Sequence, residues 1–497
     1  MFRRVLIANR GEIAIRIARA CREEQIESVA VFSDADRQAP HVRAADRAVF
    51  IGAAPPAQSY LSIPAIIDAA RATGCDAVHP GYGFLSENAD FARQCGQAGL
   101  VFVGPPAAVI AQMGSKIAAR QLMISAAVPV VPGSTPEDQS DDGIAADAGH
   151  VGFPVLVKAS AGGGGKGMRL VRDRESAHAL IAAARREATA AFGDGTLYVE
   201  RLIERPRHVE IQIFGDAHGN VVHLFERECS IQRRHQKVME ESPSPALTPA
   251  LRTEMGATAV RAARAAGYVN AGTIEFLLEG YGDTARFYFL EMNTRLQVEH
   301  PVTEAIAGVD LVRAQFAVAA GSALPWTQAS LAMRGHAVEC RVYAEDPADG
   351  FLPQAGPLVL YREPAGPGIR VDSGVAEGGI VSVHYDPLLA KLTAWAETRS
   401  AALARAASAL HTFPVLGIRT NVPFLIRLLD HPEMRAGRLH TGFIEEHAAE
   451  LLTTPDPPAE ALAAAALAGP AQRNPESDEV ASTPDPWSSI RGWGREP

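Results

Sequence analysis

The chain has few cysteines and no C-x-x-C pair. The five cysteines stand far apart, at positions 21, 75, 95, 229 and 340. This spacing argues against a disulfide framework or a cysteine zinc site, and it is typical of a protein from a reducing compartment. We therefore expect a cytoplasmic protein.

Long hydrophobic runs are also missing. No stretch reaches 18 apolar residues, and the longest candidate, residues 461–468, is short and mostly alanine. A bilayer-spanning helix needs about 20 apolar residues. The N-terminal segment MFRRVLIANRGEIA carries two arginines but no apolar signal core. We expect neither a membrane partner nor a secretory signal.

The chain lacks an excess of positive charge. Its 47 Lys and Arg residues stand against 57 Asp and Glu residues, which gives a net charge of −10. Binding to a nucleic-acid backbone requires a basic surface, so a nucleic-acid partner is not expected. The 47% hydrophobic and 21% charged content is ordinary for a globular protein. At roughly 150 residues per domain, 497 residues predict about three domains.

Residues 1–113 predict a small open α/β domain. RVLIA (4–8) and SVAVF (28–32) are short apolar runs typical of buried strands. Gly11 interrupts the pattern, and EIAIRIARACRE then has apolar residues at helical spacing. Strand, helix and strand in this order predict a βαβ unit.

Residues 114–330 predict an α+β domain. PVLVKAS (154–160) and GMRLV (167–171) are strands that flank a glycine run, and TLYVE is a third strand. HVEIQIFGD and VVHLFERE predict a hairpin with one buried face, and GTIEFLLEG and RFYFLEMN predict another. Residues 331–446 form a third part, and the Ala- and Pro-rich residues 447–497 predict a flexible tail.

The glycine run Gly162–Gly167 predicts a phosphate-binding hairpin tip. A strand rather than a helix follows it, which excludes a Rossmann turn, and Lys166 precedes glycine rather than Ser or Thr, which excludes a Walker A loop. Bare backbone N–H groups can close over phosphates, and Lys158 adds a charge. The alternative is a surface turn without a ligand. Four consecutive glycines are entropically costly, which favours the functional interpretation.

Two carboxylates predict a metal site. If the second hairpin pairs across residues 281–285, Glu275 lies opposite Glu291, and Asn293 shares that face. Like charges opposite each other destabilise a sheet, and a divalent cation such as Mg²⁺ reverses that effect. The alternative is a pair of solvated carboxylates on an exposed face.

The segment NTRLQVEHPVTE (293–304) follows the predicted metal strand. Arg295 can hold a planar anion by two hydrogen bonds, and Glu299 can act as a general base. A polar loop with ordinary salt bridges is the alternative. Residues 227–241 are locally basic and form either a solvated face or a pocket for an anionic substrate.

A series of long motifs resembles biotin carboxylase, the ATP-grasp component of biotin-dependent carboxylases. In order, they are RRVLIANRGEIAIRI, HPGYGFLSEN, KASAGGGGKGM, PRHVEIQIFGD, ERECSIQRRHQKVMEESP, GTIEFLL, EMNTRLQVEHPVTE, GHAVECRVYAEDP and HYDPLLAKL. The resemblance covers about residues 1–446. It implies an N-terminal open α/β (pre-ATP-grasp) domain over 1–113. The resemblance also implies an ATP-grasp domain over 114–330, with a mobile glycine-rich lid at about 132–202. It further implies a C-terminal α+β domain over 331–446.

The resemblance also implies a reaction and its residues. ATP and bicarbonate give carboxyphosphate, and its CO₂ passes to biotin on a separate carrier protein. Mg²⁺ or Mn²⁺ would be bound by Glu275, Glu291 and Asn293. Bicarbonate would be positioned by Lys237, Arg295, Gln297 and Val298, with Glu299 as the base and Arg341 stabilising the biotin enolate. The nucleotide would be bound by Lys116, Lys158, Gly163, Gly164, Gly165, Lys166, Gly167, Met168, Glu200, Arg201, Ile203, His208, Gln232, His235 and Leu277.

The expected partners are a biotin carboxyl carrier protein, carboxyltransferase subunits and a second copy of the chain. No M-K-M biotinylation motif occurs, so the biotin is expected on another chain. The ending DPWSSIRGWGREP resembles the sequence that follows biotin carboxylase in longer carboxylase α-chains. The alternatives are another ATP-grasp ligase that uses bicarbonate and a non-catalytic nucleotide-binding subunit.

Overall fold

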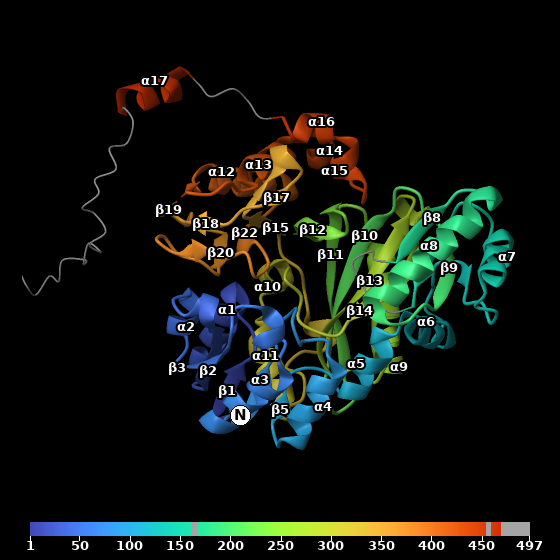
Figure 1. Ribbon diagram of the computed structural model, residues 1–497, viewed down its shortest axis with the longest axis horizontal. Coiled ribbons are helices and arrows are strands. Elements are labelled where there is room, and N and C mark those ends of the chain that lie inside the picture. The colour runs from blue at the N-terminus through green and yellow to red at the C-terminus, as the bar shows by residue number, and fades with distance from the viewer. Residues whose placement is uncertain (161–166, 454–458, 469–497) are drawn as a thin grey trace, which may run out of the picture. The chain divides into compact units, whose positions relative to one another are not determined.

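The computed structural model describes residues 1–160, 167–453 and 459–468 (Figure 1). The chain divides into two units, Met1–Leu452 and Thr453–Pro497. The glycines expected at the lid tip, residues 163–165, and Lys166 lie outside the described residues.

The first part of the chain is an open, fully parallel sheet with the order β3-β2-β1-β4-β5. Its strands are β1 (Arg4–Ile7), β2 (Glu27–Ser33), β3 (Arg47–Gly52), β4 (Ala77–His79) and β5 (Val101–Phe102). Its helices are α1 (Gly11–Glu23), α2 (Pro40–Ala44), α3 (Ile63–Thr73), α4 (Ala89–Gln97) and α5 (Ala107–Gly114). Successive side chains of a strand point to opposite faces, so Val5 and Ile7 pack under α1 while Leu6 packs under α3. The predicted βαβ unit and open α/β class are confirmed.

The segment that carries the glycine run forms a four-stranded antiparallel sheet with the order β6-β9-β7-β8. The elements are α6 (Lys116–Ser125), β6 (Gly133–Ser134), α7 (Asp141–Val151), β7 (Val155–Ala159), β8 (Met168–Val171), α8 (Arg174–Phe192) and β9 (Leu197–Arg201). Helices α7 and α8 bury a separate apolar core against this sheet. The predicted pairing of the two strands around the glycines is confirmed.

A single eight-stranded antiparallel sheet runs through the middle and C-terminal parts, with the order β14-β13-β10-β11-β12-β15-β22-β20 (Figure 1). Its strands are β10 (Arg207–Gly215), β11 (Val221–Arg233), β12 (Gln236–Ser242), β13 (Asn270–Glu279), β14 (Arg286–Asn293), β15 (His336–Tyr343), β20 (Ile369–Ser373) and β22 (Leu388–Ala396). Pairing of β12 with β15 joins two segments that the sequence assigns to different domains. Both predicted hairpins are confirmed.

The prediction that the first hairpin has only one buried face is wrong. All nine residues of β10 are buried. Val209, Ile211 and Ile213 pack against α9 (Pro249–Ala265). The polar side chains of the opposite face are buried as well, because they bond to one another: Arg227 of β11 donates hydrogen bonds to Glu210 and Gln212.

Helices cover the C-terminal part, and short strands connect them. The helices are α10 (His300–Ala307), α11 (Leu311–Ala319), α12 (Arg399–His411), α13 (Val422–Asp430), α14 (Pro432–Arg435), α15 (Phe443–Glu446) and α16 (Ala448–Leu451). The short strands are β16 (Glu345–Asp346), β17 (Leu352–Pro353), β18 (Gly356–Pro357), β19 (Leu360–Tyr361), β21 (Ile380–Val381) and β23 (Val415–Leu416).

The first unit continues to Leu452 rather than ending at residue 446. Leu451 of α16 is buried in its core, which explains the extension beyond the predicted boundary. In the second unit, Ala459–Ala468 forms helix α17 within the segment expected to be a flexible tail. Alanine has the highest intrinsic helix propensity, and this stretch is mostly alanine.

All five cysteines are free and buried. In the described ranges, no helix is both long and apolar enough to cross a membrane.

Candidate active site

The polar face of the large sheet and the loop after β14 form a pocket of about 460 Å³. Most of the side chains predicted to bind metal and bicarbonate line it. The predicted residues in its lining are His208, His235, Lys237, Glu275, Glu291, Asn293, Arg295, Gln297, Val298, Glu299 and Arg341. Five strands, the turn before β12 and the loop after β14 therefore bring together residues that are up to 133 positions apart in the sequence.

Glu275 and Glu291 are directly opposite each other on β13 and β14, as predicted. Asn293 lies on the same face, and its Nδ2 donates to Glu275 Oε1 at 2.9 Å. Glu275 is 4% exposed, which excludes the alternative of two solvated carboxylates. Glu291 has no hydrogen-bond or ion-pair partner among the residues that the structure describes. Burial and the negative charge of Glu275 both raise the pKa of Glu291.

Lys237 is at the centre of the charged cluster. Its Nζ lies 2.6 Å from Glu210 Oε2, 2.9 Å from Glu275 Oε1 and 2.6 Å from Glu299 Oε1. Burial opposes its charge, but the three carboxylates raise its pKa well above the ordinary value. Lys237 is therefore a permanent cation that holds three carboxylates together.

Glu299 ends the loop and directly precedes α10. Its two oxygens face two cations, Lys237 at 2.6 Å and Arg341 Nη2 at 2.8 Å. Burial would raise the pKa of Glu299, but these two charges and that of Arg227 hold it well below its ordinary value. In this arrangement Glu299 is ionised and is a weak base.

Arg295 organises the loop between β14 and α10. Its guanidinium donates to Gln297 Oε1 at 2.5 Å, to Asn293 Oδ1 at 3.0 Å and to Glu87 Oε2 at 2.9 Å. Gln297 in turn donates to Glu275 Oε1 at 3.5 Å. One arginine thus links the predicted metal ligand Asn293 with the predicted bicarbonate ligand Gln297.

A second charged group joins the sheet that carries the glycine run to α6. Lys158 Nζ lies 2.6 Å from Glu200 Oε2, and Arg120 Nη1 donates to Glu200 Oε1 at 2.9 Å. Both carboxylate oxygens of Glu200 are therefore already paired. Lys116, the first residue of α6, lines a small cavity together with Arg120 and Glu200. Burial lowers the pKa of Lys116. Glu291 lines both this cavity and the larger pocket, so the two are adjacent.

Three further residues predicted to contact the nucleotide, Ile203, Leu277 and Arg201, differ in their surroundings. Ile203 and Leu277 meet in one apolar cluster. The Arg201 guanidinium forms two hydrogen bonds with Glu279, at 2.9 and 2.8 Å, and donates to the hydroxyl of Tyr288, a member of that cluster, at 3.3 Å.

Three further predicted residues lie on hairpins around the pocket. Gly167 has a φ of +68°, and a Cβ there would come within 2.9 Å of the Ala159 Cβ. Met168 begins β8 opposite Lys158, and Gln232 is opposite Lys237 in the β11–β12 hairpin. Glycine is therefore required at position 167 by both backbone conformation and space.

A second cavity, of about 430 Å³, adjoins the charged pocket. It has aromatic walls, and it shares Arg295, Val298, Arg341, Tyr343 and Asp386 with the charged pocket. Its aromatic residues are Tyr82, Phe84, Tyr343 and Tyr385. The fully buried Lys391 lies behind it and donates to the Val298 carbonyl at 2.7 Å.

Sequence reasoning missed several residues of this site. Glu210, Glu240, Glu87 and Lys391 each contact a residue that it predicted, and Arg227 contacts Glu210. Glu210 follows His208 by two positions, so strand alternation places both on one face and could have identified it. Arg227 and Glu240 lie in residues 227–241, the locally basic segment already considered as a pocket for an anion. Glu87 and Lys391 belong to distant segments, and no local pattern links them to the site.

Three family models match the chain in order. They are the N-terminal domain of biotin carboxylase over residues 1–110, the ATP-binding domain of the carbamoyl-phosphate synthase L chain over 115–327, and the C-terminal domain of biotin carboxylase over 339–446. Together with the paired carboxylates, these matches define an ATP-grasp ligase.

Full-length relatives make the assignment more specific. The biotin carboxylase of Halalkalibacterium halodurans is 51% identical over 447 residues, which cover 90% of this chain and 98% of the relative. The mitochondrial methylcrotonoyl-CoA carboxylase subunit alpha of Rattus norvegicus is 51% identical over 452 residues, which cover 91% of this chain and 63% of the relative. This chain thus spans about three fifths of the alpha subunits that it matches.

Solved structures agree with this assignment. The biotin carboxylase domain dimer of Hydrogenobacter thermophilus 2-oxoglutarate carboxylase, solved with MgADP, ADP and bicarbonate, is 44% identical with a TM-score of 0.88. The match covers 92% of this chain and all of that one. Campylobacter jejuni biotin carboxylase, in a β,γ-ATP complex, is 43% identical with a TM-score of 0.87, over 90% of this chain and 99% of that one. The chain belongs to the biotin carboxylase family, which confirms the resemblance seen in its motifs.

Proposed function

We propose that this chain uses ATP and bicarbonate to carboxylate a biotin carried by another protein. The observation that carries the proposal is the meeting of two cavities at Val298 and Arg341, beside Glu299. One cavity is lined by carboxylates and cations, and the other is lined by aromatic rings. This arrangement suits a reaction that activates a small anion in one chamber and transfers it to a ring system in the next.

The residues present fit a divalent cation. Glu291 has no bonding partner in the described ranges and is opposite Glu275, an arrangement that costs stability unless a cation lies between them. With Asn293 they supply the hard oxygen ligands that Mg²⁺ or Mn²⁺ prefers. When bound, the metal offsets the charge that develops during phosphoryl transfer.

We assign the nucleotide to the space between the lid and the large sheet. Lys116 and Lys158 would contact the phosphates, together with the glycine loop that lies outside the described residues. Because Glu200 is already paired through both oxygens, its backbone rather than its carboxylate is the group available to adenine. Ile203 and Leu277 supply an apolar wall for the base. Closure of the lid would exclude water from carboxyphosphate.

Bicarbonate would occupy the pocket between Lys237, Arg295, Gln297 and the backbone of Val298. Glu299 must become a stronger base before it can deprotonate this anion. When Lys237 turns from Glu299 to the bound bicarbonate, Glu299 loses one of the charges that depress its pKa. Binding of bicarbonate thereby makes Glu299 a stronger base, and Glu299 stays a weak base in the empty site.

Biotin would enter the aromatic cavity, with its ureido oxygen toward Arg341. Arg341 already pairs with Glu240 and with Glu299. A guanidinium at this position stabilises the enolate that forms when the ureido nitrogen loses its proton.

The partners belong to the same proposal. Relatives are alpha subunits of carboxylases, and one solved relative is a dimer of biotin carboxylase domains. We propose that this chain forms a homodimer, serves a separate biotin carrier and carboxyltransferase subunits, and acts in the cytoplasm.

The deciding experiment measures ATP hydrolysis by the purified chain with Mg²⁺. We expect hydrolysis to require bicarbonate and to increase with free biotin. Stimulation by an amino donor instead of biotin would indicate a different ATP-grasp ligase, and an absence of hydrolysis would indicate a nucleotide-binding subunit. Glu299→Gln is expected to abolish the bicarbonate-dependent rate, and Arg341→Ala is expected to lose the biotin stimulation most.

A further inference from the structure

A second group of metal-ligand side chains lies on the C-terminal helices. His431 separates α13 from α14, His447 separates α15 from α16, and Glu450 lies in α16. Their pocket, of about 370 Å³, shares none of its described lining residues with the cavities of the active site. The cluster is therefore a separate site, and the reaction proposed above leaves it without a role.

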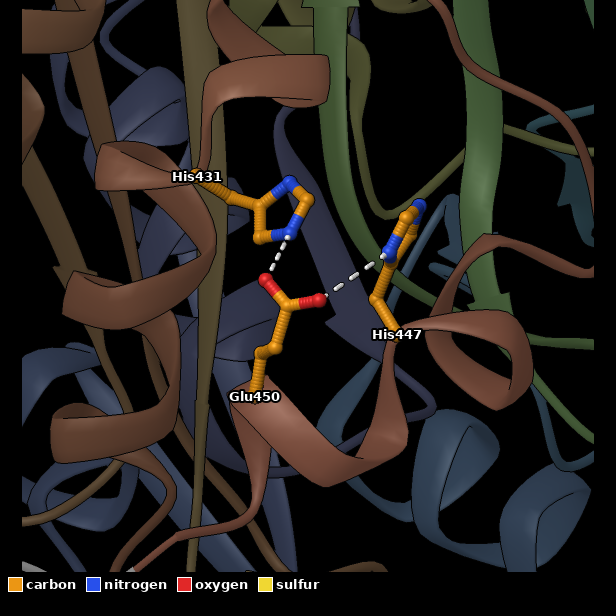
Figure 2. Close-up of side chains that lie close together, drawn as sticks. All are labelled: His431, His447 and Glu450. Atoms are coloured by element: carbon orange, nitrogen blue, oxygen red, sulfur yellow. Dashed lines mark hydrogen bonds and ion pairs between the residues drawn. The ribbon is translucent and has the colours of Figure 1, made fainter.

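The three side chains converge on one point. Figure 2 shows the two imidazoles on either side of the Glu450 carboxylate, each with a ring nitrogen turned toward it. His431 Nε2 lies 3.0 Å from Glu450 Oε2, and His447 Nδ1 lies 4.0 Å from Glu450 Oε1. One ligand atom from each residue lies within 4.8 Å of the other two. Ligands of a tetrahedral zinc ion are about 3.4 Å apart, given bonds of about 2.1 Å. Small side-chain rotations bring these atoms to that spacing.

The charges around the pocket favour a cation. Three carboxylates line it, and two of them are neutralised: Glu433 pairs with Arg438 and Glu446 pairs with Arg205. Among the described residues, Glu450 contacts only the two imidazoles. Both arginines that line the pocket therefore already pair with other carboxylates, and no guanidinium among its described lining residues is left to pair with Glu450.

The imidazoles are held in place by their surroundings. The buried Phe443 ring lies 5.4 Å from the His431 ring and 4.7 Å from the His447 ring, and the two imidazoles are 4.4 Å apart. His431 Nδ1 accepts the Glu433 backbone N–H at 3.3 Å, which turns Nε2 toward Glu450. Metal binding at Nε2 places the ring proton on Nδ1, which breaks this long hydrogen bond in exchange for the metal bond. Glu450 is exposed, so an ion can enter from solvent.

We propose that His431, His447 and Glu450 bind one divalent transition-metal ion, with Zn²⁺ as the preferred ion. Two imidazoles and a carboxylate are a ligand set that suits zinc, and water completes the tetrahedron. The bound ion links the end of α13 to α16, the last helix of the first unit. It therefore stabilises the C-terminal helices and takes no part in catalysis.

The test uses the full-length chain, stripped of metal with a chelator and then equilibrated with zinc chloride. Zinc retained after gel filtration is counted by mass spectrometry, and anomalous diffraction at the zinc edge locates it. We expect one more zinc equivalent in the wild type than in His447→Gln or Glu450→Gln, with anomalous density among the three side chains. At 100 times the dissociation constant, zinc should raise the unfolding midpoint of the wild type by about 2 °C or more.

Matched controls separate this site from other ligands. His411→Gln and Glu254→Gln change exposed residues elsewhere and should retain the full zinc content and the midpoint shift. All four variants should keep bicarbonate-dependent ATP hydrolysis, which shows that they fold. Equal zinc content in the wild type, His447→Gln and Glu450→Gln would overturn the proposal. An absence of bound zinc in the wild type would overturn it too, and would leave Glu450 as an ordinary carboxylate partner of two histidines.

Discussion

Single side chains in the active site are held by opposing charges rather than by apolar packing. Lys237 contacts three carboxylates, and Glu299 contacts two cations. Buried ions of this kind contribute little net stability, because desolvation offsets their attraction. Because these buried charges add little to stability, we infer that they serve catalysis or substrate binding. Substitutions of Glu291 and Lys391 should therefore change activity and the free energy of unfolding to different extents.

The first prediction concerns Glu291→Gln. Removing one of two opposed carboxylates relieves repulsion of about 0.2–1 kcal/mol, so the free energy of unfolding should stay equal or rise. The same change removes a metal ligand. Bicarbonate-dependent ATP hydrolysis should fall by more than the roughly 10–100-fold expected for the loss of an outer-shell partner. Urea denaturation and a magnesium titration of the rate check both parts. Unchanged magnesium dependence would show that Glu291 is not a ligand.

The second prediction concerns Lys391, a buried positioning residue. Its Nζ donates to the Val298 carbonyl at 2.7 Å and lies 3.1 Å from Glu12 Oε1. Lys391→Met leaves a buried carboxylate without its cation, at a cost of about 3–5 kcal/mol. The loop that carries Val298, the proposed bicarbonate contact, should also shift. We expect a higher KM for bicarbonate with little change in the KM for ATP, measured at a temperature where the variant is folded. A loss of stability with an unchanged bicarbonate KM would reduce Lys391 to a structural role.

At the scale of elements, the pairing of β12 with β15 makes one sheet of two domains and also creates an electrostatic problem. Glu240 of β12 is directly opposite Glu339 of β15. Burial raises the pKa of Glu240 to about 7, with Arg341 opposing and Glu299 adding to the effect. Burial likewise raises the pKa of Glu339 to about 8. The positive charge of Lys391 opposes this rise, and the negative charge of Glu240 adds to it. The strand pair therefore binds protons near neutral pH.

The third prediction follows from these two pKa values. Between the ordinary glutamate pKa of about 4.3 and the folded value of about 8, the folded chain binds a proton that the unfolded chain has lost. Stability should therefore fall as pH rises through this window, by up to about 1.4 kcal/mol per pH unit for each proton. Glu339→Gln should flatten the fall between pH 5.5 and 8, measured by urea denaturation. Glu254→Gln, on the exposed face of α9, should leave the slope unchanged. A wild-type stability that rises across this range would contradict the assignment.

At the scale of the whole molecule, the aromatic cavity exists only because the first and last parts of the chain meet. The Tyr385 hydroxyl donates to the Ala54 carbonyl at 2.7 Å, and the Arg10 guanidinium lies 4.3 Å from the centre of the Tyr385 ring. All residues proposed for the site belong to the unit Met1–Leu452.

The fourth prediction is that Thr453–Pro497 can be removed without loss of chemistry. A chain that ends at Leu452 keeps the buried Leu451 and every proposed site residue. Its bicarbonate-dependent ATP hydrolysis, with and without free biotin, should match that of the full chain within about twofold. This expectation rests on the independence of the two units. A large loss in the biotin-stimulated rate alone would assign the second unit a role at the biotin cavity.

The sequence by itself determined the local structure and part of the site. Strand alternation and loop length predict that Glu275 is opposite Glu291, because a hairpin sets its own register over a few residues. The βαβ unit and the hairpin around the glycine run are local in the same way. Long motifs predicted the family and residues that line the charged pocket.

Only the tertiary structure decided which distant elements lie side by side. It paired β12 with β15, buried both faces of β10, and brought Glu87 to Arg295 and Lys391 to Val298. The hydrogen bond of Lys391 to the Val298 carbonyl joins residues 93 positions apart, and that of Arg295 to Glu87 joins residues 208 positions apart. No periodic pattern records such contacts, because periodicity reports which face of an element is apolar and not which element covers it. The physical reason is that local pairing follows from backbone geometry, whereas the charge network forms only when the whole core packs.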